Sequence, residues 1–167
     1  MMKRRDEIEE RGSMPFQLGV QWVIELYGCS RERIEKAGAV EEIMVSAARI
    51  SNSVITKTIF HEFSERGVNG LVAMLSGAYL AIHTWPDKGY AALDIFSAGS
   101  VMPQETAAFI AGRLGAGRTL IYLVPRGKFD ESGVPTPPRK VTPIDGAAAP
   151  EVPKIVRAAI VLFGLIF

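Results

Sequence analysis

Residues 78–99, AYLAIHTWPDKGYAALDIFSAG, constrain the fold more than any other stretch of the chain. Two runs rich in apolar and aromatic residues flank the segment Pro-Asp-Lys-Gly at 86–89. Proline fixes φ and glycine accepts a positive φ, so this segment is typical of a tight turn. The block therefore predicts two neighbouring β-strands, one that ends at Trp85 and one over 90–99.

Similar patterns before and after this block predict the other strands of a sheet. Alternation of apolar and polar residues, with many β-branched and aromatic side chains, is typical of strands. It predicts strands over 16–29, 53–63 and 118–127, and it divides 71–85 at Ser76-Gly77 into two strands, the second of which is the strand that ends at Trp85. The segment ERGVNG at 65–70 has the composition of a turn.

Two helices complete the pattern. In residues 30–50, Ser30 is a candidate N-cap and apolar residues recur at helical spacing, which predicts an amphipathic helix with a weak point or a break at Gly38. Residues 103–115 begin with proline and end with glycine, which predicts a second helix. The order β-α-β-β-β-β-α-β predicts an α+β fold: a two-layer sandwich whose mostly antiparallel sheet carries two helices on one face. Because several strands are apolar on both faces, we expect dimerisation through the sheet.

Composition limits the classes of function. The 167 residues are 48% hydrophobic and 22% charged, which suits one globular domain. A net charge of +1 provides no field to attract nucleic acid. Cys29 is the only cysteine and there are two histidines, so we expect no internal disulfide, no metal site and a cytoplasmic location. No glycine-rich phosphate-binding pattern is present.

The two ends of the sequence differ from its middle. Residues 1–14 are predicted to be a flexible tail, and 15–133 the folded domain. Residues 134–153 are rich in proline, glycine and alanine and are predicted to be an extended linker. The apolar segment 154–167 is either a last core element or a truncated membrane helix, with Lys154 and Arg157 as its flanking charges.

Five motifs together carry a family resemblance. The sequence IHTWPDKGYAALDIFSAG at 82–99 is similar to the signature of bacterial and archaeal S-adenosylmethionine decarboxylases, and ELYGC, TIFHEF, GVNG and RGKFDESGVP stand in the family's order over roughly 17–135. The resemblance implies a chain that cuts itself at a Glu-Ser bond. The serine becomes an N-terminal pyruvoyl group, the electron sink for decarboxylation. It also implies a link to spermidine and other polyamine biosynthesis.

The resemblance implies a site at which most functional groups are changed here. The family's Glu-Ser-His positions are Gly77, Ala78 and Tyr79, its second serine is Asn69, its proton-donating cysteine is Ala98, and its processing histidine is retained as His83. Ala78 has no hydroxyl group, so no pyruvoyl group can form from it and we expect no cofactor. Ser76 is an alternative nucleophile, because a shift of two residues along a strand keeps a side chain on the same face.

Three hypotheses follow from the family resemblance and from the composition of the two ends of the sequence. The first is a homologue that does not process itself but binds an S-adenosylmethionine-like ligand, with Phe63, Trp85 and Tyr79 as binding aromatics, or pairs as a homodimer or as a heterodimer with an active paralogue. The second is an active decarboxylase that uses Ser76. The third is the soluble domain of a larger membrane protein, tethered through the C-terminal segment.

Overall fold

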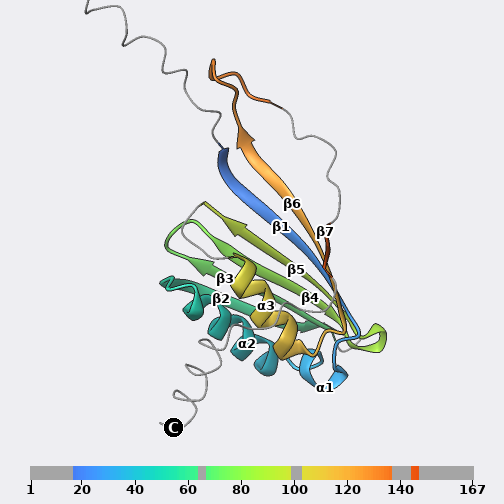
Figure 1. Ribbon diagram of the computed structural model, residues 1–167. Helices are drawn as coiled ribbons and strands as arrows, with labels where there is room; N and C mark the ends of the chain where they lie inside the picture. Colours follow the sequence, from blue (N-terminus) through green and yellow to red (C-terminus); the bar gives the residue numbers. More distant parts are fainter. Residues whose placement is uncertain (1–16, 64–66, 99–102, 137–143, 147–167) are drawn as a thin grey trace, which may run out of the picture.

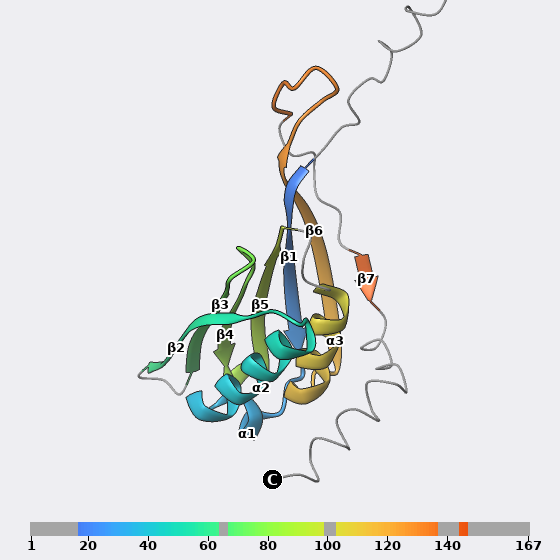
Figure 2. The ribbon, with the colours of Figure 1, turned by 90° about the vertical axis from the view of Figure 1, so that its left-hand side faces the viewer.

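The computed structural model describes residues 17–63, 67–98, 103–136 and 144–146 (Figure 1). Within these residues, one antiparallel sheet runs in the order β2-β3-β4-β5-β1-β6-β7. Its strands are β1 (Gln17–Tyr27), β2 (Ile55–Phe63), β3 (Gly67–Met74), β4 (Tyr79–Trp85), β5 (Tyr90–Ser97), β6 (Arg118–Lys128) and β7 (Ile144–Gly146). Helices α1 (Arg31–Ile34), α2 (Ala37–Ile50) and α3 (Pro103–Leu114) all lie against one face of the sheet (Figures 1 and 2).

The core lies between the sheet and the helices. Alternate strand residues such as Ile24, Ile82 and Leu93 are almost fully buried and join Met44 of α2 and Ile110 of α3 in one apolar cluster. The residues between them in each strand point to the other side of the sheet, because side chains alternate along a strand. We call that second side the open face, since no helix of the described part covers it (Figure 2).

Two glycines with positive φ close the central hairpins. A single 3₁₀ turn, η1 (Pro86–Lys88), ends at Gly89 with φ 57°. Between β3 and β4, Gly77 has φ 75°, the N–H of Met74 donates to the carbonyl oxygen of Ala78 at 3.0 Å, and the N–H of Gly77 donates to that of Met74 at 3.2 Å. Glycine adopts this backbone conformation without steric cost, which explains its presence at both turns.

The α+β class, the order of the elements and the helices on one face are confirmed. Two details of the prediction are wrong. The helix predicted over 30–50 is divided into α1 and α2, with the break at residues 35–36 and not at Gly38. The turn predicted over 65–70 belongs to β3 from Gly67 onward. The rings of Phe63 and Phe60 lie over Gly67 and Gly70, so these glycines are well packed in the sheet.

The C-terminal part departs from the expected linker. Within 134–153, residues Ile144–Gly146 form β7 and pair with Thr119–Ile121 of β6, so at least this part is not a free spacer. The predicted tail at 1–14 and the apolar segment at 154–167 lie outside the described residues. Of the helices in the described part, none combines the length and the apolar character that a bilayer crossing requires.

Candidate functional site

The open face gathers most of the residues that the sequence singled out. Asn69 of β3 and His83 of β4 are paired directly across the two strands, so their side chains lie next to each other on this face. Tyr79 and Trp85 lie on the same face of β4, four residues and two residues from His83. Phe63 lies at the end of β2, opposite Gly67. The structure therefore places these side chains on one surface of the sheet.

A hydrogen-bonded chain crosses three strands of this face. The Tyr79 hydroxyl donates to Oε1 of Gln21 at 3.0 Å, and Nε2 of Gln21 donates to Oδ1 of Asp94 at 3.3 Å. Gln21 is only 6% exposed. Burial raises the pKa of Asp94 above its usual value, although the hydrogen bond from Gln21 and the nearby His83 oppose that shift. The chain therefore holds a half-buried carboxyl group at a fixed position in the middle of the sheet.

A second carboxylate lies near Asp94. Glu25 of β1 accepts a hydrogen bond from the Tyr90 hydroxyl, and both burial and this contact raise the pKa of Tyr90. The two acidic side chains are close enough that Glu25 contributes to the raised pKa of Asp94. Together Glu25 and Asp94 give the middle of the open face acceptor groups and negative charge.

An aromatic surface continues from His83 toward the turn at 86–89. The rings of His83 and Trp85 are 6.2 Å apart and nearly parallel, and those of Trp85 and Tyr90 are 5.2 Å apart. The ring of Tyr27 is 5.3 Å from that of Tyr90. Trp85 and Tyr27 are 40% and 42% exposed, so flat faces remain available to a ligand ring or to a facing protein surface.

The turn residues form a separate group. Ala78 is 3% exposed and belongs to the apolar core, on the opposite side of the sheet from Tyr79. Ser76 and Gly77 are exposed in the turn, and Ala98 is exposed just after β5. Because Tyr79 pairs with Phe96, the turn and Ala98 lie at the same end of the sheet. Ser76 lies in the turn and not in a strand, so strand alternation does not place its side chain on the side of Ala78 as predicted.

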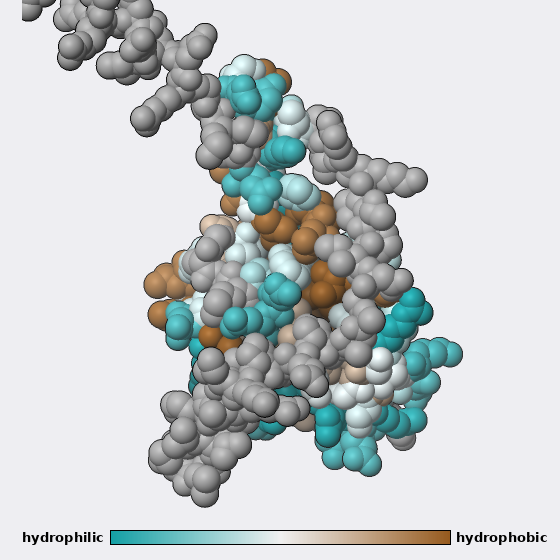
Figure 3. Space-filling model, viewed as in Figure 1, coloured by the Kyte–Doolittle hydropathy of each residue, from teal (hydrophilic) through white to brown (hydrophobic). Residues whose placement is uncertain are grey.

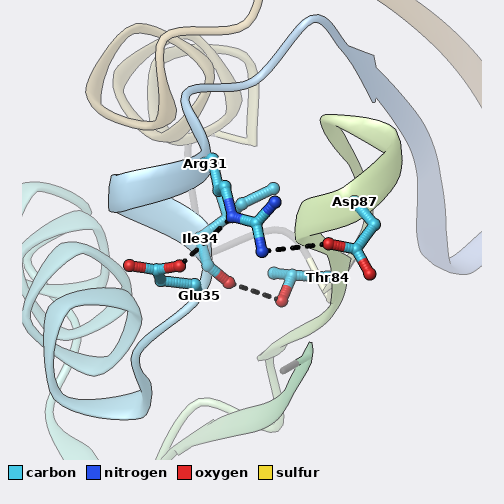
Figure 4. Close-up of polar contacts among 5 residues, drawn as sticks. All are labelled: Arg31, Ile34, Glu35, Thr84 and Asp87. Carbon is cyan, nitrogen blue, oxygen red and sulfur yellow. Dashed lines mark hydrogen bonds and ion pairs between the residues drawn. The ribbon is translucent and has the colours of Figure 1, made fainter. Parts of the chain in front are cut away.

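Thr84 shows that part of the central motif is structural. It is fully buried, its hydroxyl donates to the carbonyl oxygen of Ile34 at 2.7 Å, and it accepts the N–H of Val68 at 2.8 Å. Beside it, Arg31 pairs with Asp87 at 3.1 Å and with Glu35 at 3.5 Å (Figure 4). These contacts fix α1 to the end of β4 and thereby the position of His83 and Trp85.

Sequence reasoning missed Gln21 and Glu25, and it missed the hydrogen bonds that Tyr90 and Asp94 make on this surface. Strand alternation places Gln21 and Glu25 on one face of β1, but only the pairing of β1 with β5 brings them to Asp94 and Tyr90. No set of three His, Cys, Asp or Glu side chains within the described ranges forms a metal-binding group. Burial raises the pKa of the Cys29 thiol to about 11, which disfavours the reactive thiolate.

Comparisons with known proteins agree on one family. The family model for S-adenosylmethionine decarboxylase matches residues 20–127. An S-adenosylmethionine decarboxylase proenzyme of Pseudomonas aeruginosa is 43% identical over 111 residues, which are 66% of this chain and 69% of that protein. The proenzyme of Acidithiobacillus ferrooxidans is 37% identical over 75% of this chain and 95% of its own length. The crystal structure of the adenosylmethionine decarboxylase from Aquifex aeolicus has a TM-score of 0.61 and 26% identity, over 66% of this chain and 92% of that one.

Proposed function

The chain belongs to the S-adenosylmethionine decarboxylase family, and we propose that it is a member that does not process itself and that binds a ligand or a partner chain instead of decarboxylating. The family links it to polyamine biosynthesis and to a carboxy-lyase reaction. The proposal concerns only whether this chain still carries out that reaction by itself.

The observation that carries the proposal is the chemistry of the turn at 75–78. Self-cleavage in this family needs a hydroxyl group at the position of Ala78, and an alanine methyl group cannot attack a carbonyl carbon. The turn is a regular hairpin closed by backbone hydrogen bonds, with Gly77 in a conformation that glycine adopts without strain. An intact chain therefore fits this turn well, and a pyruvoyl cofactor is not expected.

Ser76 offers a weaker route to cleavage. It lies in the exposed turn rather than in β3 or β4. Self-cleavage by its hydroxyl group would break the peptide bond between Leu75 and Ser76. Leu75 is 72% exposed. A scissile carbonyl in so open a place has few groups around it that could stabilise a tetrahedral intermediate. The geometry supports the uncleaved chain over this alternative.

The open face supports the proposed binding function. It combines the flat rings of Trp85 and Tyr90 with the acceptor groups of Glu25 and Asp94. A ligand that carries both a heteroaromatic ring and a positive charge, such as S-adenosylmethionine, matches these two features. His83, which lies between the ring surface and Asp94, is the retained family residue that we expect to contact it.

The same face supports a partner chain. Ile59 and Leu71 are paired across β2 and β3 on the open face and are 51% and 36% exposed. A sheet surface with apolar and aromatic side chains gains stability when a second sheet covers it. The partner that we propose is a second copy of this chain or an active paralogue.

Intact mass before and after long incubation tests the loss of processing. We expect one species with the mass of the complete chain, and no release of carbon dioxide from carboxyl-labelled S-adenosylmethionine. Two fragments cut between Leu75 and Ser76, absent in Ser76→Ala, would overturn the proposal and restore the enzyme.

Calorimetric titration with S-adenosylmethionine tests the binding function. We expect Trp85→Ala to weaken binding roughly tenfold, because a stacked ring is lost. His61→Ala is the matched control for His83→Ala, since His61 is exposed on the same face but on the edge strand β2. Equal effects of the two histidine substitutions would contradict the site, and no binding by the wild type would leave partner binding as the function.

A further inference from the structure

A hollow on the helix side of the sheet is the feature that the proposed function does not use. It has a volume of about 340 Å³ and lies where β1 enters the sheet, between the end of β5 and the first residue of α3. Its lining is mostly apolar: Leu18, Val20 and Trp22 of β1, with Ala98 and Pro103 on the other side. Leu18 is 61% exposed. We call this hollow the β1 groove.

The apolar surface continues beside the groove. Trp22 pairs with Leu123 of β6, and Val20 pairs with Pro125, so these residues extend the same side of the sheet outward from the groove. Seen from the helix side, brown side chains gather where β1 and β6 rise above the helices (Figure 3). Neither α2 nor α3 extends along this part of the two strands (Figure 1).

This chain contains a segment whose chemistry matches the groove. Residues 158–167, AAIVLFGLIF, are apolar without exception, and they lie outside the described part of the structure. Burying such side chains against Leu18 and Trp22 removes apolar surface of both from water. We propose that segment 158–167 packs into the β1 groove of its own chain.

The position of β7 makes this contact reachable. Gly146, the last residue of β7, lies opposite Thr119 of β6. Val20 lies opposite Pro125, six residues further along β6, which corresponds to about 20 Å at the rise of a strand. The connecting residues 147–157 can span about 36 Å when extended. A segment tethered so close has a local concentration that favours it over free partners.

The inference is independent of the open face, because the groove lies on the other side of the sheet. It is tested in the full-length chain by quenching of Trp22 fluorescence with acrylamide, with Trp85→Phe to leave Trp22 as the single tryptophan. The tail variant is Leu162→Ser with Phe163→Ser. The matched control is Val134→Ser, an exposed apolar residue in the loop after β6.

We expect the tail variant to raise the quenching constant of Trp22 severalfold and to speed hydrogen exchange in residues 17–22, while the control changes neither. Unchanged quenching and exchange would overturn the proposal. A protection of Trp22 from acrylamide that is lost on dilution would assign the contact to a second copy of the chain and would contradict the proposal. Full-length protein that floats with phosphatidylcholine vesicles, while the quenching of Trp22 stays unchanged, would assign the segment to a membrane and would also contradict the proposal.

A covalent test does not depend on the stability of the variants. Leu18→Cys and Phe163→Cys are combined with Cys29→Ser, so that two cysteines remain. Oxidation should give an intramolecular disulfide at the mass of the monomer. Failure to form it under conditions in which the same chain forms intermolecular disulfides would contradict the proposed contact.

Discussion

Thr84 holds three elements together through one hydroxyl group. It donates to Ile34 of α1 and accepts from Val68 of β3 while fully buried. Thr84→Val keeps the shape of the side chain but leaves a carbonyl oxygen and an N–H without partners in the core. Each such group costs about 1 to 3 kcal/mol, so we expect the free energy of unfolding to fall by about 2 to 6 kcal/mol in urea titrations.

Thr84→Ser is the control for this prediction. It keeps the hydroxyl group and removes one buried methyl group, so it should cost about 1 kcal/mol. If Thr84→Ser destabilises the protein as much as Thr84→Val does, the methyl group and not the hydrogen bonds anchors α1.

Asp94 makes the stability of the folded protein depend on pH. Its pKa in the folded protein is raised, mainly by burial, so the folded state holds the proton to a higher pH than the unfolded state does. Stability from this group is therefore lost as the pH rises through the raised pKa. We expect Asp94→Asn to be more stable than the wild type at pH 7, and this advantage to disappear below pH 3.8, the ordinary value for the side chain.

Urea titrations of both proteins across that pH range measure the difference. Asp130→Asn is the opposite control, because hydrogen bonds from Ser132 and Val134 lower the pKa of Asp130. Asp130→Asn should therefore lower the free energy of unfolding at pH 7, and it should lower it less in acid. A difference between Asp94→Asn and the wild type that does not vary with pH would contradict the assigned shift.

At the scale of the element, alanine substitutions at two glycines distinguish the effect of backbone strain from that of side-chain packing. An added Cβ meets nothing within 4 Å at either Gly77 or Gly38, but Gly77 has φ 75° and Gly38 lies in the first turn of α2. Gly77→Ala should therefore destabilise the β3–β4 hairpin by about 1 kcal/mol, whereas Gly38→Ala should stabilise the protein by up to about 1 kcal/mol. Thermal unfolding of both variants measures the two signs, and a stabilising Gly77→Ala would contradict the turn geometry.

The elements show what local sequence can and cannot predict. Alternation and turn residues were sufficient for the strands around Pro86–Lys88, because both signals are local. The position of the break between α1 and α2 was not predicted, since the N–H of Ala37 is satisfied by Glu62 of β2, 25 residues away. At the open face, His83 and Trp85 could be named from the motif, but the chain from Tyr79 through Gln21 to Asp94 depends on strand pairing that no local pattern encodes.

At the scale of the whole molecule, the proposed assembly through the open face can be tested by charged substitutions. Ile59→Lys with Leu71→Lys places two charges on this face without entering the core, since both side chains are substantially exposed. If a second copy covers the face, the dissociation constant of the dimer should rise at least about a hundredfold, because each buried lysine must lose its water or force the sheets apart. Sedimentation equilibrium over a range of concentrations measures it.

Leu75→Lys is the control, since Leu75 is 72% exposed in the turn and not on the face itself. A dimer that survives the double substitution but is weakened by Leu75→Lys would place the interface at the end of the sheet. A wild-type chain that is monomeric at all concentrations leaves the exposed rings of Trp85 and Tyr27 uncovered in the isolated protein. In that case the homodimer is excluded, and an active paralogue becomes the partner to test by mixing the two chains and measuring decarboxylation with and without the double substitution.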